Sequence, residues 1–161
     1  MHEIEIQVNG RPMRTTVDVG ETLVDVLRNK LGFVEVKNGC GQGDCGACTV
    51  LLDGEAVNSC LTLAVQADGR SVTTTKGLGS PEAPHPLQTA FINHGAVQCG
   101  FCSSGMILSA ASLLEQNATP TREEIREGIS GNLCRCTGYT KIVDAIEEAA
   151  REMELTGKWG A

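Results

Sequence analysis

Eight cysteines are the residues of this sequence whose type and spacing could do chemistry. Four of them follow the spacing C-x4-C-x2-C-x11-C, which is typical of plant-type 2Fe-2S ferredoxins. The other four form C-x2-C and C-x-C in the second half of the chain. The first group is Cys40, Cys45, Cys48 and Cys60, and the second group is Cys99, Cys102, Cys134 and Cys136. Each group supplies the four thiolates of a 2Fe-2S cluster, so the sequence predicts two clusters.

A glycine-rich loop carries three thiols of the first group. Glycines there can adopt positive φ and let backbone N–H groups approach the sulfurs, which tunes the potential of a cluster. These glycines are Gly39, Gly41, Gly43 and Gly46. The fourth thiol, Cys60, is expected to close the site from beyond a hairpin.

The second group lies at the ends of predicted helices. Cys99 and Cys102 precede a helix whose N-terminus offers free N–H donors and a positive dipole end, which favours thiolates as metal ligands. Cys134 and Cys136 lie between two further helices. Four ligands from two loops could therefore hold a second cluster and stabilise a small helical domain.

Zinc is the main alternative to iron, because two cysteine pairs in each half also suit tetrahedral sites with four sulfurs. The glycine-rich C-x4-C-x2-C loop favours iron and sulfide instead. A thioredoxin-like role for Cys45 and Cys48, or for Cys99 and Cys102, leaves the other cysteines unexplained. Eight buried structural thiols without a metal are improbable in two such quartets.

Three glycines of the first loop also match the dinucleotide fingerprint G-x-G-x-x-G, namely Gly41, Gly43 and Gly46. That fingerprint needs a strand before it and a helix after it, whereas residues 49–52 are predicted to form a strand. We therefore expect no nucleotide site on this chain, and no catalytic acid, base or substrate pocket. Its expected chemistry is electron transfer.

The first half of the chain shows the pattern of a small mixed sheet packed on one helix. Asn9-Gly10 and Asp53-Gly54 are turn signals for two hairpins. Strands are predicted at residues 4–8, 13–19, 49–52, 56–57 and 72–75, and a helix at residues 22–31. The apolar side chains Leu23, Val26, Leu27 and Leu31 fall on one stripe of that helix.

The second half reads as helices, so the fold class is α+β. Helices are predicted at residues 87–94, 105–116, 122–130 and 141–153, the third with a capping box of Thr121 and Glu124. The glycine and proline run between the halves is expected to sustain neither helix nor sheet. The predicted organisation is a domain at 1–76, a linker at 77–86, a helical domain at 87–155 and a tail at 156–161.

Composition limits the partners. The 161-residue chain has a net charge of -7, whereas nucleic acids and anionic membranes would demand a basic face. No apolar run approaches the length of a membrane span. Thiols in tight groups, with no sign of secretion, predict a reducing cytoplasm.

Three stretches carry a resemblance to a known family: residues 37–50, residues 96–106, and residues 131–139, which read Gly-Asn-Leu-Cys-Arg-Cys-Thr-Gly-Tyr. The chain resembles the small iron-sulfur subunit of the molybdenum hydroxylases, the family of xanthine dehydrogenase, aldehyde oxidoreductase and carbon monoxide dehydrogenase. The resemblance implies a plant-ferredoxin-like β-grasp domain followed by a four-helix bundle. It also implies that the first quartet ligates an outer cluster facing a flavin subunit, and the second an inner cluster near molybdopterin.

By the same resemblance, Gln98 should hydrogen-bond the pterin, and Cys136 should lie where its cluster touches the pterin edge. The implied partners are a large subunit that binds molybdopterin, in a dinucleotide form, and a medium subunit that binds FAD. They would assemble as a heterotrimer or a dimer of heterotrimers. Electrons would pass from molybdenum through both clusters to flavin, and substrate choice would belong to another chain.

Two alternatives to an electron-transfer subunit remain open. A free-standing ferredoxin explains the first half only, and a regulatory module stapled by iron-sulfur clusters or zinc would suit less complete quartets.

After Cys102 the family usually has Thr or Ser and then Pro, but here Ser103 and Ser104 follow. Serine is a good N-cap, so we expect the helix start and the cluster to be intact.

Overall fold

The first half of the chain is a five-stranded mixed sheet in the computed structural model, which describes residues 1–157. Its order is β2-β1-β5-β3-β4, with β1 parallel to β5 and the other neighbours antiparallel. The strands are β1 (His2–Val8), β2 (Arg11–Val17), β3 (Thr49–Leu52), β4 (Glu55–Asn58) and β5 (Ser71–Thr73). The predicted mixed sheet is confirmed.

The two hairpins form where the turn residues predict them. Asn9 and Gly10 both have positive φ, at 52° and 76°, as a two-residue turn of type I′ requires. Asp53 and Gly54 repeat the pattern at 51° and 88° between β3 and β4. The alternating side chains of β1 turn one apolar face inward, so that Ile6 is fully buried.

The helix predicted at residues 22–31 is not one regular helix. A single α-turn, α1 (Leu23–Asp25), is followed by a π-helix, η1 (Val26–Lys30). Thr22 accepts the N–H of Asp25 and so caps the start. Leu23, Val26 and Leu27 of the expected stripe are still buried in the core of this half, and Leu31 is partly buried against it. A 3-10 helix, η2 (Ala64–Ala67), was not predicted.

The segment between the halves contains more helix than its composition indicates. The short helix α2 (Thr75–Leu78) enters the run that was expected to hold none, and α3 begins at Pro86. Proline suits this first helical position because its missing N–H needs no partner there. His85 caps α3, since its Nδ1 accepts the N–H of Leu87 at 3.2 Å.

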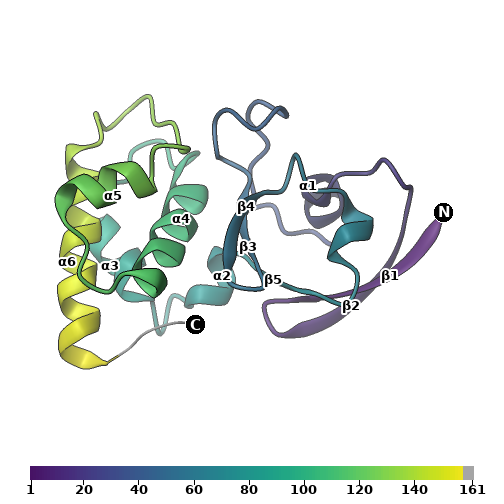
Figure 1. Cartoon of the computed structure of the whole chain (residues 1–161), viewed down its shortest axis with the longest axis horizontal. Helices are drawn as coiled ribbons and strands as arrows, with labels where there is room; N and C mark the ends of the chain where they lie inside the picture. Colours follow the sequence, from purple (N-terminus) through teal and green to yellow (C-terminus); the bar gives the residue numbers. More distant parts are fainter. Residues whose placement is uncertain (158–161) are drawn as a thin grey trace.

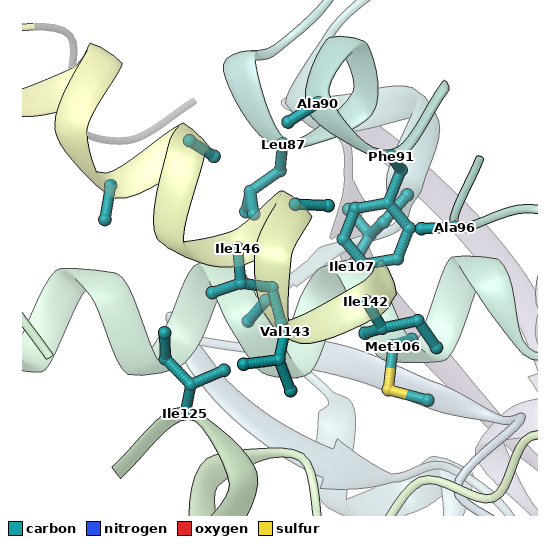
Figure 2. Packing of buried hydrophobic residues seen from close by; sticks show 14 of the residues in the cluster. Leu87, Ala90, Phe91, Ala96, Met106, Ile107, Ile125, Ile142, Val143 and Ile146 are labelled. Atoms are coloured by element: carbon teal, nitrogen blue, oxygen red, sulfur yellow. The ribbon is translucent and has the colours of Figure 1, made fainter. Parts of the chain in front are cut away.

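The second half consists of helices around one apolar core (Figure 2). Leu87 and Phe91 of α3 meet Ile142 and Ile146 of the last helix, with Met106 beside them. The helices are α3 (Pro86–Asn93), α4 (Ser103–Gln116), α5 (Arg122–Gly128) and α6 (Thr140–Thr156). The capping box at the start of α5 is confirmed. Residues 158–161 of the predicted tail lie outside the described residues.

The two halves lie side by side, with α4 packed against β3 and β4 (Figure 1). The loop before β3 and the loop between α5 and α6 emerge on the same side of the molecule, the upper side of Figure 1. These loops carry cysteines of both groups. Within residues 1–157, no helix is long and apolar enough to cross a membrane.

Candidate iron-sulfur sites

The loop before β3 wraps around the thiol of Cys40. Its Sγ accepts backbone N–H groups from Gln42 at 3.5 Å, Asp44 at 3.3 Å and Cys45 at 3.4 Å. The N–H groups of Gln42 and Cys45 are the main reason that the pKa of Cys40 falls to about 6. Backbone dipoles therefore favour a thiolate here, as the sequence predicted for a metal ligand.

The other thiols of the first group gather around the same point. Ser59 donates its N–H and its hydroxyl to the carbonyl oxygen of Cys48, which places Cys60 next to Cys48. Burial raises the pKa of Cys60 to about 11, and the neighbouring Cys48 and Cys40 add to this effect. Cys45 lies beside Cys40, since its N–H donates to the Cys40 thiol. The structure thus brings the four predicted cysteines together.

Three of the four loop glycines have the predicted positive φ, but Gly39 does not. Gly39 is needed for space, since a Cβ there would lie 2.9 Å from Sγ of Cys45. Gly46 is needed for both reasons: its φ is +70°, and a Cβ would lie 2.3 Å from the carbonyl oxygen of Gly131.

The second group is centred on Cys102 and Cys134. Burial raises the pKa of Cys102 to about 12, and Cys134 and Cys99 add to the rise. Burial would also raise the pKa of Cys134, but hydrogen bonds from the hydroxyl and N–H of Thr137 lower it overall. Tyr139 positions this loop, because its hydroxyl oxygen accepts the N–H of Cys134 at 2.8 Å.

The remaining thiols of the second group face outward. Cys99 and Cys136 are exposed, and so is Gln98, which precedes Cys99. Apolar side chains beside them, Phe101 and Leu133, are exposed as well. The second site therefore opens toward the surface, where a partner could cover it.

The start of α4 differs from the prediction. The N-cap position is Cys102 rather than a serine, and Ser103 already belongs to the helix. The hydroxyl oxygens of Ser103 and Ser104 are buried, and within residues 1–157 they have no hydrogen-bond partner. These serines therefore do not cap the helix by the expected side-chain bond.

Both groups fit a binuclear cluster by their chemistry. A mononuclear site needs its ligands around one ion. A 2Fe-2S cluster takes two thiolates for each iron and so spreads its four ligands more widely. The Cys40 loop also offers the backbone N–H donors that such a cluster uses.

The sequence did not predict the hydrogen bonds that join the two sites. The N–H of Leu133 donates to the carbonyl oxygen of Cys45 at 2.9 Å, and the amide of Asn132 donates to Gly46. Gly131-Asn132 reads as an ordinary turn pair in sequence. Its position directly before the C-x-C pair was the available signal.

Comparisons with known proteins identify both halves. Residues 6–74 match the family model of the 2Fe-2S iron-sulfur cluster binding domain, and residues 74–147 match that of the [2Fe-2S] binding domain. The chain is 56% identical over 147 residues to the nicotine 6-hydroxylase small subunit of Paenarthrobacter nicotinovorans, covering 91% of this chain and 88% of that one. The chain belongs to the small iron-sulfur subunits of the molybdenum hydroxylases.

Relatives in this family occur as separate subunits and as parts of longer chains. The aldehyde oxidoreductase of Megalodesulfovibrio gigas is 51% identical over 148 residues, which are 90% of this chain and 16% of that protein. The crystal structure of quinoline 2-oxidoreductase from Pseudomonas putida 86 contains a chain with a TM-score of 0.92 and 48% identity, with 97% of each chain covered. As a small iron-sulfur subunit, this chain is part of an oxidoreductase.

Proposed function

We propose that this chain is the electron-transfer subunit of a molybdenum hydroxylase and carries electrons between a molybdopterin subunit and a flavin subunit. The observation that supports this most directly is the pair of complete cysteine quartets in adjoining loops. A free-standing ferredoxin or a stapled regulatory module is not favoured, because the similarity to hydroxylase subunits extends over both halves.

The eight cysteines are the proposed ligands. Cys40, Cys45, Cys48 and Cys60 ligate one 2Fe-2S cluster, and Cys99, Cys102, Cys134 and Cys136 ligate the other. Each cluster, when bound, supplies one-electron chemistry. The N–H groups aimed at Cys40 favour its thiolate form, while burial of Cys48 and Cys60 keeps water from that side of the site. Thr137 favours the thiolate form of Cys134, because its hydroxyl and its N–H both contact the Cys134 sulfur.

The outward face of the second site is the proposed contact with molybdopterin, which we assign to Gln98 and Cys136. Both residues are exposed, and Phe101 and Leu133 beside them offer apolar surface that a partner would bury. At the first site Leu61 is 62% exposed directly after Cys60, which supports a second contact face. A relay needs one such face for each partner.

The assembly completes the proposal. The proposed partners are a large subunit with molybdopterin, in a dinucleotide form, and a medium subunit with FAD. Together the three form a heterotrimer or a dimer of heterotrimers in the cytoplasm.

We place the domains at 1–76 and 87–155, with a linker at 77–86. The first domain is proposed as a β-grasp fold and the second as a four-helix bundle, supported by the packing of α3, α4, α5 and α6 around one core.

Metal analysis of the anaerobically purified chain tests this proposal. We expect roughly four iron and four labile sulfide per chain, and two distinct paramagnetic signals after reduction. The reduced chain should pass electrons to an artificial acceptor but hydroxylate no aldehyde or purine until the molybdenum and flavin subunits are added. Stoichiometric zinc without sulfide would contradict the proposal.

A further inference from the structure

Asn132 is a buried polar residue at the boundary between the two halves, with 4% of its surface exposed. Its side-chain amide donates a hydrogen bond to the carbonyl oxygen of Gly46 at 3.0 Å and another to Oγ1 of Thr49 at 3.3 Å. Gly46 directly follows Cys45, and Thr49 directly follows Cys48. A side chain from the second site is therefore bonded inside the loop of the first site.

Backbone meets backbone around this amide. A Cβ on Gly105 of α4 would lie 2.2 Å from the carbonyl oxygen of Gly46, and a Cβ on Gly46 would lie 2.3 Å from that of Gly131. Either distance is far inside van der Waals contact, so only glycine lets the two halves approach this closely. The approach brings the Gly46 carbonyl within reach of Asn132.

Two further contacts join the same loops. The N–H of Leu133 donates to the carbonyl oxygen of Cys45 at 2.9 Å. A Cβ on Gly39 would lie 3.3 Å from the ring of Phe101, so that ring rests against the loop of Cys40. Both segments that carry the second cysteine group therefore touch the first cysteine loop.

These contacts differ in how strongly they fix geometry. α4 packs on β3 and β4 and accepts a hydrogen bond there, from the N–H of Ala56 to Oγ of Ser112 at 3.4 Å, and neither residue belongs to a cysteine loop. The hydrogen bonds of a buried amide are directional, and a satisfied buried polar group specifies one arrangement of its surroundings. The Asn132 amide thus constrains the two loops in a way that the helix packing does not.

We propose that Asn132 is a positioning residue that fixes the separation and the relative orientation of the two iron-sulfur sites. This inference rests on the proposed function, because it assumes that both quartets hold clusters. Electron exchange between two centres falls steeply with their separation, so a fixed distance gives the relay one defined rate. Asn132 does this without touching either group of thiols in the described structure.

Electron paramagnetic resonance of the full chain, with both clusters reduced, tests the proposal. The spin-spin interaction between two paramagnetic centres depends on their distance and mutual orientation. In the wild type we expect a spin-spin splitting between the two clusters. In Asn132→Ala we expect unchanged iron content and unchanged g-values of each cluster, but a loss of that splitting. Asn93→Ala, which removes an exposed asparagine at the end of α3, is the matched control and should keep the splitting.

Thr49→Val provides a milder variant, since it keeps the volume and removes the hydroxyl that accepts the Asn132 amide and donates to Gly46. It should weaken the splitting less than Asn132→Ala does. Wild-type splitting in Asn132→Ala with full iron would overturn the proposal. Loss of second-site iron in both variants would also overturn it, because Asn132 would then be needed to keep the second cluster bound and not to fix the geometry between the two clusters.

The same spectra separate this inference from the proposed function. A wild-type chain without two iron-sulfur signals would refute the electron-transfer proposal itself. A wild-type chain with two interacting clusters, and variants identical to it, would leave that proposal standing and remove only the role of Asn132.

Discussion

The backbone N–H of Leu133 donates a hydrogen bond to the carbonyl oxygen of Cys45 at 2.9 Å, across the boundary between the two halves. Leu133 itself is 55% exposed, so this hydrogen bond and not burial is what holds its amide. A backbone bond between two cysteine loops means that local opening of one loop disturbs the other.

Hydrogen exchange at Leu133 checks this coupling. We expect the amide of Leu133 to exchange slowly in the folded chain despite its exposed side chain, because its hydrogen is held by Cys45. Mass spectrometry of peptides that span residues 130–136 measures the rate. Leu133→Ala keeps the donor and should keep the protection. Exchange as fast as in an unfolded peptide would mean that the bond does not persist.

The contact between Gly105 and Gly46 predicts a sharp difference between two alanine substitutions. Gly105→Ala should destabilise the chain by about 1 to 3 kcal/mol, because its Cβ would lie 2.2 Å from the carbonyl oxygen of Gly46. Gly131→Ala is the matched control, since within residues 1–157 its Cβ would meet nothing within 4 Å. Urea unfolding of both variants gives the comparison, and equal midpoints would contradict the close contact.

Ligand substitutions should separate the two clusters. Cys45→Ser should disturb one paramagnetic signal and leave the other, while Cys134→Ser should do the converse. Cys134→Ser should also loosen the helical half, because a small domain depends on its metal. Iron analysis and spectra of the reduced variants measure both effects. If either substitution removed both signals from a folded chain, the assignment of the ligands would be incorrect.

His85 predicts a dependence of stability on pH. Burial lowers the pKa of His85, and its Nδ1 must stay unprotonated to accept the N–H of Leu87. An unperturbed histidine has a pKa of about 6.5, so below that pH the unfolded chain binds more protons at His85 than the folded chain does. The contribution of His85 to stability is therefore full above that pH and declines below it.

His85→Asn keeps a capping acceptor and removes the titrating group. Between about pH 7.5 and about pH 5.5 the unfolding temperature should fall less in this variant than in the wild type. Thermal unfolding followed by circular dichroism measures the difference. Equal losses in the two proteins would show that His85 is not the titrating group.

The sequence predicted features that depend on neighbouring residues. Both hairpins follow from Asn9-Gly10 and Asp53-Gly54, because two adjacent residues determine the turn. The capping box of Thr121 is local in the same sense. The prediction that Cys40, Cys45 and Cys48 share one site is also local, because a short loop can direct several thiols to one point.

Other features depend on residues far apart and could not be predicted. The contact of Gly46 with Gly105 and Asn132 requires knowing how the two halves pack, which no local pattern encodes.

Two local features also differ from the prediction. Ser103 is not the helix cap, because Cys102 takes the N-cap position. The apolar stripe predicted a regular helix at residues 22–31, and it gave no sign that the part after Asp25 would be a π-helix.

The place of β5 in the sheet sets an order of events during synthesis. β5 lies between β1 and β3, so the first half can close once Thr73 has left the ribosome, with all four of its thiols already made. Cys136 and α6 follow on the order of several seconds later at ordinary rates of translation. The nascent chain therefore presents all four thiols of the first site before those of the second site have all been made.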